Sequence, residues 1–345
     1  MELRQKKIIG LDIGTRNIKV IGMNRTGVCG KWSIGSIPQG LVSSHGILAE
    51  DLLAGEIRDL IKENEIRGRR CSFCLPSQHV ITRSVFHPSM DSDVLIENIR
   101  YDMEDYLPLD ADEYYIDYRI TKTVIINGRE HWHILITAAP KKIVLSYLRV
   151  LKMAGLNPIY IDVPSNCLEK LLISTTPKTD LSNENNGNLC IVDIGCLSIN
   201  IIIFSGGRYF IDKTFSLEDG VVSPVNQRGS NGTGHSSDNL PNDINPAIKQ
   251  TQSKLVHIGD EIIKTIRYYE NQMSGDAPIN EIILLGGGSL IPGLPGSLMK
   301  NIGISVITFS DWMDRKKTGG ISGLTGTDLM LMGNAIGSTI RRDSL

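Results

Sequence analysis

The stretch Gly10-Leu11-Asp12-Ile13-Gly14-Thr15-Arg16-Asn17-Ile18 has a counterpart later in the chain, Ile191-Val192-Asp193-Ile194-Gly195-Cys196-Leu197-Ser198-Ile199. Each copy predicts a β-strand that ends in Asp-Ile-Gly, a tight turn, and a second strand. Glycine lets the backbone approach a phosphate closely, and successive turn amides form an anion-binding nest. The aspartate can hold water molecules on a Mg²⁺ ion bound to that phosphate. Two such hairpins facing each other would clamp a polyphosphate from both sides.

A third glycine cluster, Gly286-Gly287-Gly288, follows a strand predicted over 281–285. Such a cluster suits a platform for a base or a ribose. A single Asp-x-Gly hairpin is weak evidence, because most such hairpins are ordinary β-turns with a solvated aspartate. Two copies followed by a strand-terminal Gly-Gly-Gly are much stronger evidence, and together they indicate a duplicated nucleotide cleft.

Length and composition exclude several classes of protein. The chain has 345 residues, 36 Lys+Arg, 38 Asp+Glu and a net charge of −2, which predicts two or three globular domains. The lack of a basic excess argues against a nucleic-acid binder. No window offers the roughly 18 apolar residues of a membrane span, and the N-terminus lacks the apolar core of a signal peptide. Six unevenly spaced cysteines favour reduced thiols, so we expect a cytoplasmic α/β protein without direct membrane insertion.

Strand-like and helix-like stretches alternate along the chain. Asn127-Gly128 predicts a hairpin turn between strands over 114–126 and 131–138. Leu255, Ile258, Ile262 and Ile266 line one face of an amphipathic helix. Residues 175–188 form a polar linker between two lobes, and the low-complexity tract 225–246 is expected to be disordered.

The order of these motifs resembles the phosphate-1, phosphate-2 and adenosine motifs of the actin/Hsp70/sugar-kinase superfamily. Gly333-Asn334-Ala335-Ile336-Gly337 resembles the second interdomain connector of that superfamily. Within it, the chain is similar to the PilM family of type IV pilus assembly proteins, which is related to FtsA. The stretches that carry this resemblance are Leu75-Pro76 to Pro88, Asn98 to Pro108, Ala138 to Lys141, Ala154 to Pro158 and Ile266 to Tyr269.

The resemblance implies a two-lobed actin-like ATPase fold, built from duplicated ribonuclease-H-like domains and carrying an FtsA/PilM-type insert. The first lobe would comprise residues 1–176 and be completed by about 320–345. The inserted subdomain would lie at about 82–160 within it. The second lobe would span 188–319.

The resemblance also assigns a site for ATP and Mg²⁺. Asp12, Gly14, Thr15 and Lys19 would contact phosphates from one side, and Asp193 and Gly195 from the other. Gly286, Gly287 and Gly288 would back the adenosine, and Asp12 and Asp193 would hold Mg²⁺ through water. No catalytic residue is assigned, because Pro164 stands where relatives have an acidic residue, and proline cannot act as a base. The sequence therefore favours nucleotide binding over efficient hydrolysis.

The implied function is a cytoplasmic scaffold of the inner-membrane platform that assembles type IV pili, or of a related type II secretion system. It would bind the N-terminal tail of a PilN-like protein, which would recruit it to the inner face of the membrane, and a pilus assembly ATPase is a second candidate partner. One alternative is an ATPase or small-molecule kinase of the superfamily, which should carry an acidic base in the cleft. Another is an FtsA-like division protein, which tethers to membrane by a C-terminal helix for which residues 340–345 leave no room. The oligomeric state stays open.

Two further motifs have ordinary interpretations. Cys71 and Cys74 form a lone Cys-x-x-Cys on a strand-like segment, which more often means two packed thiols than a zinc site. His131 and His133 share one strand face without a third ligand nearby, so we expect a surface pair.

Overall fold

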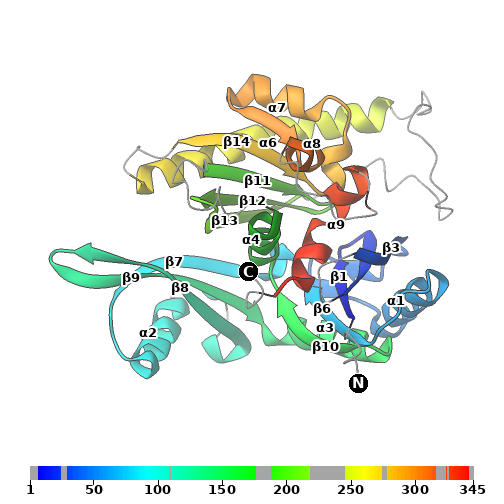
Figure 1. Ribbon diagram of the computed structural model, residues 1–345, viewed down its shortest axis with the longest axis horizontal. Helices are drawn as coiled ribbons and strands as arrows, with labels where there is room; N and C mark the ends of the chain where they lie inside the picture. Colours follow the sequence, from blue (N-terminus) through cyan, green and yellow to red (C-terminus); the bar gives the residue numbers. More distant parts are fainter. Residues whose placement is uncertain are drawn as a thin grey trace.

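The computed structural model describes residues 7–24, 29–108, 110–175, 188–217, 245–273, 278–315, 324 and 326–341. These residues form two lobes and a long insert that projects from the first lobe (Figure 1). The predicted linker lies outside the described residues except for its two ends, and so does the tract 225–246 except for Asn245 and Pro246, which begin helix α6.

The first lobe is built on a five-stranded sheet of order β10-β6-β1-β2-β3. Strands β1, β2 and β3 pair antiparallel, whereas β1, β6 and β10 run parallel. Its strands are β1 (Ile8–Ile13), β2 (Asn17–Met23), β3 (Cys29–Ser36), β6 (Arg70–Cys74) and β10 (Asn157–Asp162), with a small ribbon of β4 (Val42–Ser43) and β5 (Gly46–Ile47). Helices α1 (Glu50–Glu63) and α3 (Lys141–Met153) pack against one face of this sheet.

The second lobe repeats this topology. Its sheet has the order β13-β12-β11-β14-β15, with the same antiparallel and parallel pairings at corresponding positions. The strands are β11 (Asn188–Ile194), β12 (Ser198–Ser205), β13 (Arg208–Ser216), β14 (Ile279–Leu285) and β15 (Ser305–Thr308), and the helices are α6 (Asn245–Gln272), α7 (Leu294–Ile302) and α8 (Phe309–Arg315). The duplication inferred from the two Asp-Ile-Gly stretches is therefore confirmed.

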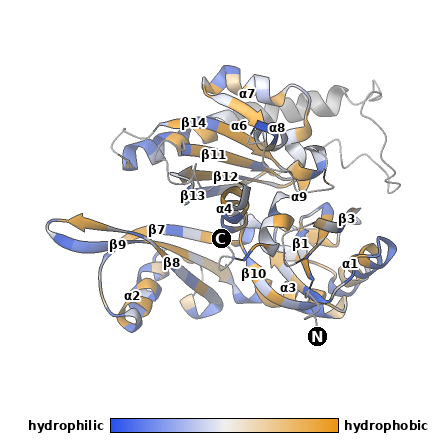
Figure 2. Cartoon of the chain, viewed as in Figure 1, coloured by the Kyte–Doolittle hydropathy of each residue, from blue (hydrophilic) through white to orange (hydrophobic). Residues whose placement is uncertain are grey.

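Both sheets are buried on their two faces near the centre of the molecule. Figure 2 shows hydrophobic residues concentrated on the inner strands of both lobes. In β12 the run Ile201-Ile202-Ile203 is wholly buried, because residues that alternate between the two faces of a covered sheet must all be apolar. None of the described helices combines the length and apolar character needed to cross a lipid bilayer.

Two helices, α4 (Pro164–Thr175) and α9 (Gly326–Thr339), lie between the lobes and contact each other (Figure 1). Their backbones come very close, because a Cβ atom on Gly337 would lie 2.2 Å from the carbonyl oxygen of Cys167. Apolar residues of both helices join a core that includes strands of the second lobe. The predicted connector Gly333–Gly337 is thus the inner part of α9, and its last glycine permits the crossing.

The insert is a three-stranded antiparallel sheet with one helix on its face. Its elements are β7 (Ile81–Pro88), α2 (Ser92–Glu104), β8 (Tyr114–Ile126) and β9 (Arg129–Pro140), in the order β7-β9-β8. Asn127 and Gly128 have φ angles of 52° and 74°, which are the values that a two-residue hairpin turn requires. The separate sheet ends at Pro140, and α3 and β10 pack into the first lobe. The insert is therefore shorter than the expected 82–160.

The face of the insert opposite α2 rests on the second lobe. The His133 ring stacks on Phe210 of β13 with ring centroids 5.7 Å apart. Arg119 of β8 donates to Glu169 of α4, and Glu169 also accepts from the backbone nitrogen of Tyr209. His133 is 2% exposed, so the expectation of a surface pair with His131 is wrong for this residue. Cys71 and Cys74 are buried free thiols, as expected.

Candidate functional site

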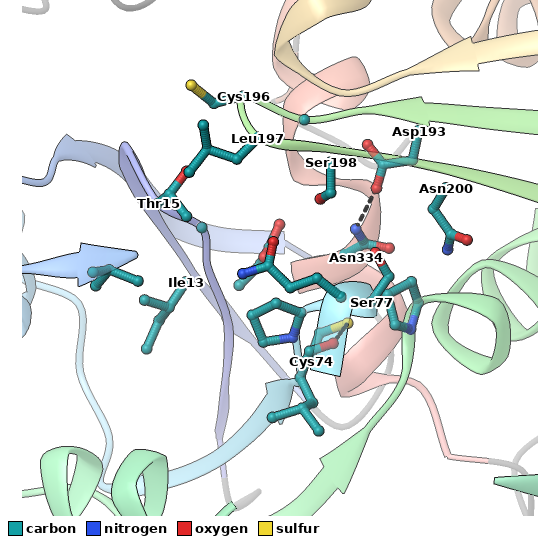
Figure 3. Close-up of a pocket in the computed structure, with 18 of the residues that line it drawn as sticks. Ile13, Thr15, Cys74, Ser77, Asp193, Cys196, Leu197, Ser198, Asn200 and Asn334 are labelled. Carbon is teal, nitrogen blue, oxygen red and sulfur yellow. Dashed lines mark hydrogen bonds between the residues drawn. The ribbon is translucent and has the colours of Figure 1, made fainter. Parts of the chain in front are cut away.

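A pocket opens between the lobes where the two Asp-Ile-Gly turns face each other (Figure 3). The first hairpin, formed by β1, its turn and β2, contributes Asp12, Gly14, Thr15 and Lys19, and the second hairpin contributes Asp193 and Gly195. Six of the nine residues predicted from the sequence therefore line one pocket. The three glycines of the Gly286-Gly287-Gly288 cluster do not line it.

The two turns have the same local geometry. The nitrogen of Gly14 donates to the oxygen of Asn17 at 3.0 Å, and the nitrogen of Gly195 donates to the oxygen of Ser198 at 2.9 Å. A Cβ atom at position 195 would lie 2.9 Å from that Ser198 oxygen. The duplicated sequence thus makes the same tight hairpin twice, and in the second hairpin the close approach of the backbone favours glycine.

Lys19 provides the positive charge of the pocket. Its Nζ atom lies 2.7 Å from Oδ2 of Asp12, the residue opposite it in the β1–β2 register. Burial alone lowers the pKa of Lys19, but the carboxylates of Asp12 and Asp193 outweigh this effect, so the pKa is raised above its ordinary value. The ammonium group is therefore paired with Asp12 and is also attracted by the charge of Asp193 in the other lobe.

Asp193 is held by α9. Its Oδ2 atom accepts a hydrogen bond of 2.8 Å from Nδ2 of Asn334, drawn as a dashed line in Figure 3. Burial raises the pKa of Asp193, and the nearby Asp12 adds to this, while Lys19 and the bond from Asn334 oppose it. Because this half-buried carboxylate is only partly hydrated, it gains from a cation placed near it.

The glycine cluster packs beneath the second turn. Gly286 has a φ of +81°, and a Cβ atom there would lie 2.3 Å from Oδ1 of Asp193. A Cβ atom on Gly288 would lie 2.2 Å from Cγ2 of Ile194. Two of the three glycines are thus required by close packing against the Asp193 hairpin.

Three polar residues that line the pocket were not among the predicted binding residues: Tyr147, Asn200 and Asn334, the last predicted only as part of the connector Gly333–Gly337. Each is buried and, within the described part of the chain, has one side-chain atom without a hydrogen-bond partner, namely Oη of Tyr147, Nδ2 of Asn200 and Oδ1 of Asn334. Asn200 could have been predicted by aligning the two hairpins, because Asn200 pairs with Asp193 as Lys19 pairs with Asp12. Tyr147 comes from α3, and no local pattern connects it with the turns.

These residues fit a magnesium nucleotide. Unpaired buried polar atoms call for a partner such as a ligand or an ordered water molecule. Mg²⁺ keeps several waters and needs only one or two carboxylates besides phosphate oxygens, and Asp12 and Asp193 supply two. Among the described residues no group of three or more metal-ligating His, Cys, Asp or Glu side chains gathers.

Comparison with known proteins places the chain in a family. The model of the family described as type IV pilus assembly protein PilM matches residues 10–320. A chain of a solved PilM-PilN type IV pilus biogenesis complex is 21% identical with a TM-score of 0.75, and the match covers 98% of both chains. A comparison with curated proteins gave no significant match.

Two other solved structures are more distant. Ethanolamine utilization protein EutJ from Carboxydothermus hydrogenoformans is 11% identical with a TM-score of 0.48, and the match covers 99% of this chain and 92% of that chain. MreB 5 of Spiroplasma citri, bound to AMPPNP, is 12% identical with a TM-score of 0.45, and the match covers 98% and 96%. The expected two-lobed actin-like α/β fold is confirmed by the duplicated sheet topology and the 0.75 match. With nine-tenths of its length matched by the family model, this chain belongs to the PilM family of type IV pilus assembly proteins.

Proposed function

We propose that the protein is a scaffold of the inner-membrane platform that assembles a type IV pilus or a related type II secretion system. In this role it binds the N-terminal tail of a PilN-like membrane protein, which recruits it from the cytoplasm to the inner face of the membrane. The family match over residues 10–320 carries this proposal, and the similarity to the chain of the PilM-PilN complex supports it. A pilus assembly ATPase is a second candidate partner.

The tail would dock beside the outer edge of β10. This strand is the last in the order of the first sheet, so one of its backbone edges has no strand partner among the described residues, and that edge faces the insert (Figure 1). Tyr160 and Ile161 of β10 are 41% and 39% exposed. An extended peptide could pair with the strand edge and place apolar side chains on these two residues. We expect micromolar affinity, about −8 kcal/mol, because a disordered tail loses entropy on docking.

Titration of a labelled PilN-like tail peptide tests the docking site. We expect the Tyr160→Ala variant to bind about tenfold more weakly than the unmodified chain, since it loses a large anchor at the edge. Tyr268→Ala is the matched control, because Tyr268 is also exposed (52%) but lies on α6 of the second lobe. No binding to the unmodified chain would refute the scaffold proposal. Equal loss in both variants would refute the site.

We further propose that the pocket binds ATP–Mg²⁺. The turn amides and Thr15 would hold phosphates, with Lys19 neutralising their charge, while Asp12 and Asp193 would hold Mg²⁺ through water. When bound, the ion would shield the phosphate charge that the two carboxylates would otherwise repel. Gly286, Gly287 and Gly288 would lie toward the adenosine, beneath the second turn.

We propose binding without efficient turnover. The carboxylates among the described pocket-lining residues are Asp12 and Asp193, and each already has a partner, Lys19 or Asn334. Pro164, the first residue of α4, lines the pocket where relatives would have an acidic residue. A general base must accept a proton from the attacking water, and proline has no group that can do so.

Thermal unfolding with and without ATP–Mg²⁺, together with phosphate release, tests this second proposal. Saturation at about 100 times the Kd would stabilise the folded state by roughly 2.7 kcal/mol. Asp12→Ala and Asp193→Ala should each abolish the ATP-dependent shift. The shift should also disappear when Mg²⁺ is omitted. An unchanged shift in both variants would refute the assignment of these aspartates, and brisk phosphate release would favour an enzyme instead.

A further inference from the structure

Asn200 occupies the position in the second hairpin that Lys19 occupies in the first. In the β1–β2 register Asp12 pairs with Lys19, and in the β11–β12 register Asp193 pairs with Asn200. The duplication thus places a hydrogen-bond donor beside each aspartate: an ammonium group in the first lobe and an amide in the second.

The Asn200 amide is held in one orientation and has an unused donor. Its Oδ1 atom accepts a hydrogen bond of 3.0 Å from Oγ1 of Thr214, the residue opposite it on β13. Its Nδ2 atom is buried without a partner among the residues that the structure describes, although the residue lines the pocket and is only 2% exposed. Figure 3 shows Asn200 on the same side of the pocket as Asp193. Because Thr214 engages the oxygen, the nitrogen is the end of the amide left for a ligand.

We propose that Nδ2 of Asn200 donates a hydrogen bond to an oxygen of a bound polyphosphate, from the side opposite Lys19. Thr214 is then a positioning residue that keeps the amide oxygen away from the phosphate. This inference rests on the proposed nucleotide site and adds a residue to it. The two lobes would hold the phosphate tail with one cationic donor and one neutral donor.

The chemistry of the site favours a phosphate oxygen as the acceptor. An N–H group cannot coordinate a cation, and the Asp193 carboxylate beside it is already bonded to Asn334. A buried amide donor gains most from a charged acceptor, because hydrogen bonds to ionised groups are about twice as strong as neutral ones. Phosphate oxygens are charged, whereas the base and the ribose of a nucleotide are neutral.

Four variants test the proposal by calorimetric titration with ATP–Mg²⁺ and, as a second probe, inorganic tripolyphosphate with Mg²⁺. Asn200→Asp keeps the shape but replaces the donor with a charged acceptor, so we expect both ligands to bind at least about tenfold more weakly. Asn200→Ala should lose a similar amount. Thr214→Val should lose less, because the amide keeps its donor but not its orientation. Thr214→Ser keeps the hydroxyl group and should bind as tightly as the unmodified chain.

The outcomes separate this inference from the nucleotide proposal. If the unmodified chain binds neither ligand, the nucleotide site itself is refuted. If it binds both and Asn200→Asp binds them equally well or better, the phosphate contact is overturned while the site stands. A lower melting temperature of the ligand-free Asn200→Ala protein, with unchanged affinity, would likewise overturn it. Should the Asn200 variants fail to fold, equal affinities of Thr214→Val and Thr214→Ser would overturn it.

Discussion

Replacing His133 by glutamine should remove a large part of the acid sensitivity of this fold. His133 lies between the insert and the second lobe, 2% exposed, with its ring 4.8 Å from Phe86 and 5.7 Å from Phe210. Thr121 Oγ1 contacts Nδ1 at 2.5 Å and Ser84 Oγ contacts Nε2 at 2.6 Å. Both ring nitrogens of a neutral imidazole are therefore satisfied in the folded state.

Burial, with a smaller effect of Lys122, lowers the pKa of His133 from 6.5 to about 4. The unfolded chain takes up a proton near pH 6.5, whereas the folded protein resists it until about pH 4. The stability that this residue contributes is thus fully present above pH 6.5 and is lost as the pH falls toward 4. The complete loss is about 3 kcal/mol, and about 2 kcal/mol of it falls between pH 8 and pH 5.

Urea unfolding at pH 8, 6 and 5 measures this contribution. The unmodified chain should lose about 2 kcal/mol more than His133→Gln between pH 8 and pH 5. His131→Gln is the matched control, since His131 lies two residues earlier on the same strand and is not buried. His79, whose pKa burial also lowers to about 4, titrates alike in all three proteins. Parallel stability curves for the unmodified chain and His133→Gln would refute the reasoning.

Three further predictions concern the packing of two glycines and one buried ion pair. Gly288→Ala should destabilise the folded protein by about 1–3 kcal/mol, because the new Cβ atom would lie 2.2 Å from Cγ2 of Ile194. Thermal unfolding measures this, and a melting temperature at or above that of the unmodified chain would contradict it. Gly55→Ala, in α1 with nothing within 4 Å of the new atom, should instead stabilise by about 0.5–1 kcal/mol in the same assay. Arg119→Met should cost about 3 kcal/mol in urea unfolding and more than Glu169→Gln, because the Glu169 side chain is 2% exposed and the Arg119 side chain 26%. The reverse order would mean that the Glu169 carboxylate is not the group that needs compensation.

Local sequence was sufficient to predict the turns and helix faces whose sequence patterns span only a few residues. The turns after Asp12 and Asp193 follow from the Asp-Ile-Gly stretches themselves, and both form the expected hairpins. The turn at Asn127-Gly128 also follows, because few residues other than Asn and Gly adopt positive φ at both positions. The apolar periodicity of α6 likewise predicts the face that packs on the second sheet.

The C-terminal boundary of the insert could not be predicted from local sequence patterns. The helix α3 and the strand β10 carry ordinary amphipathic and strand-like patterns, which do not say which sheet they join. Only the pairing of β10 with β6, and the packing of Tyr147 in the core of the first lobe, assign them to that lobe. The burial of His133 has the same origin, since it depends on Phe210, which lies 77 positions later in the chain.

In the candidate site, some features also follow from local sequence and others only from the tertiary fold. By itself, the sequence determined the two turns, because each Asp-Ile-Gly stretch forms a tight hairpin from consecutive residues, closed by a backbone hydrogen bond from its glycine. Tertiary structure alone decided that the Lys19 ammonium group lies near charges of both lobes and that Asn334 holds Asp193. It decided as well that the Asn200 donor has no partner among the described residues. It also decided that Gly286 and Gly288 pack beneath a hairpin instead of lining the pocket. The physical reason is that these contacts join side chains from separate strands and helices, whose approach is set by the packing of two lobes and not by spacing along the chain.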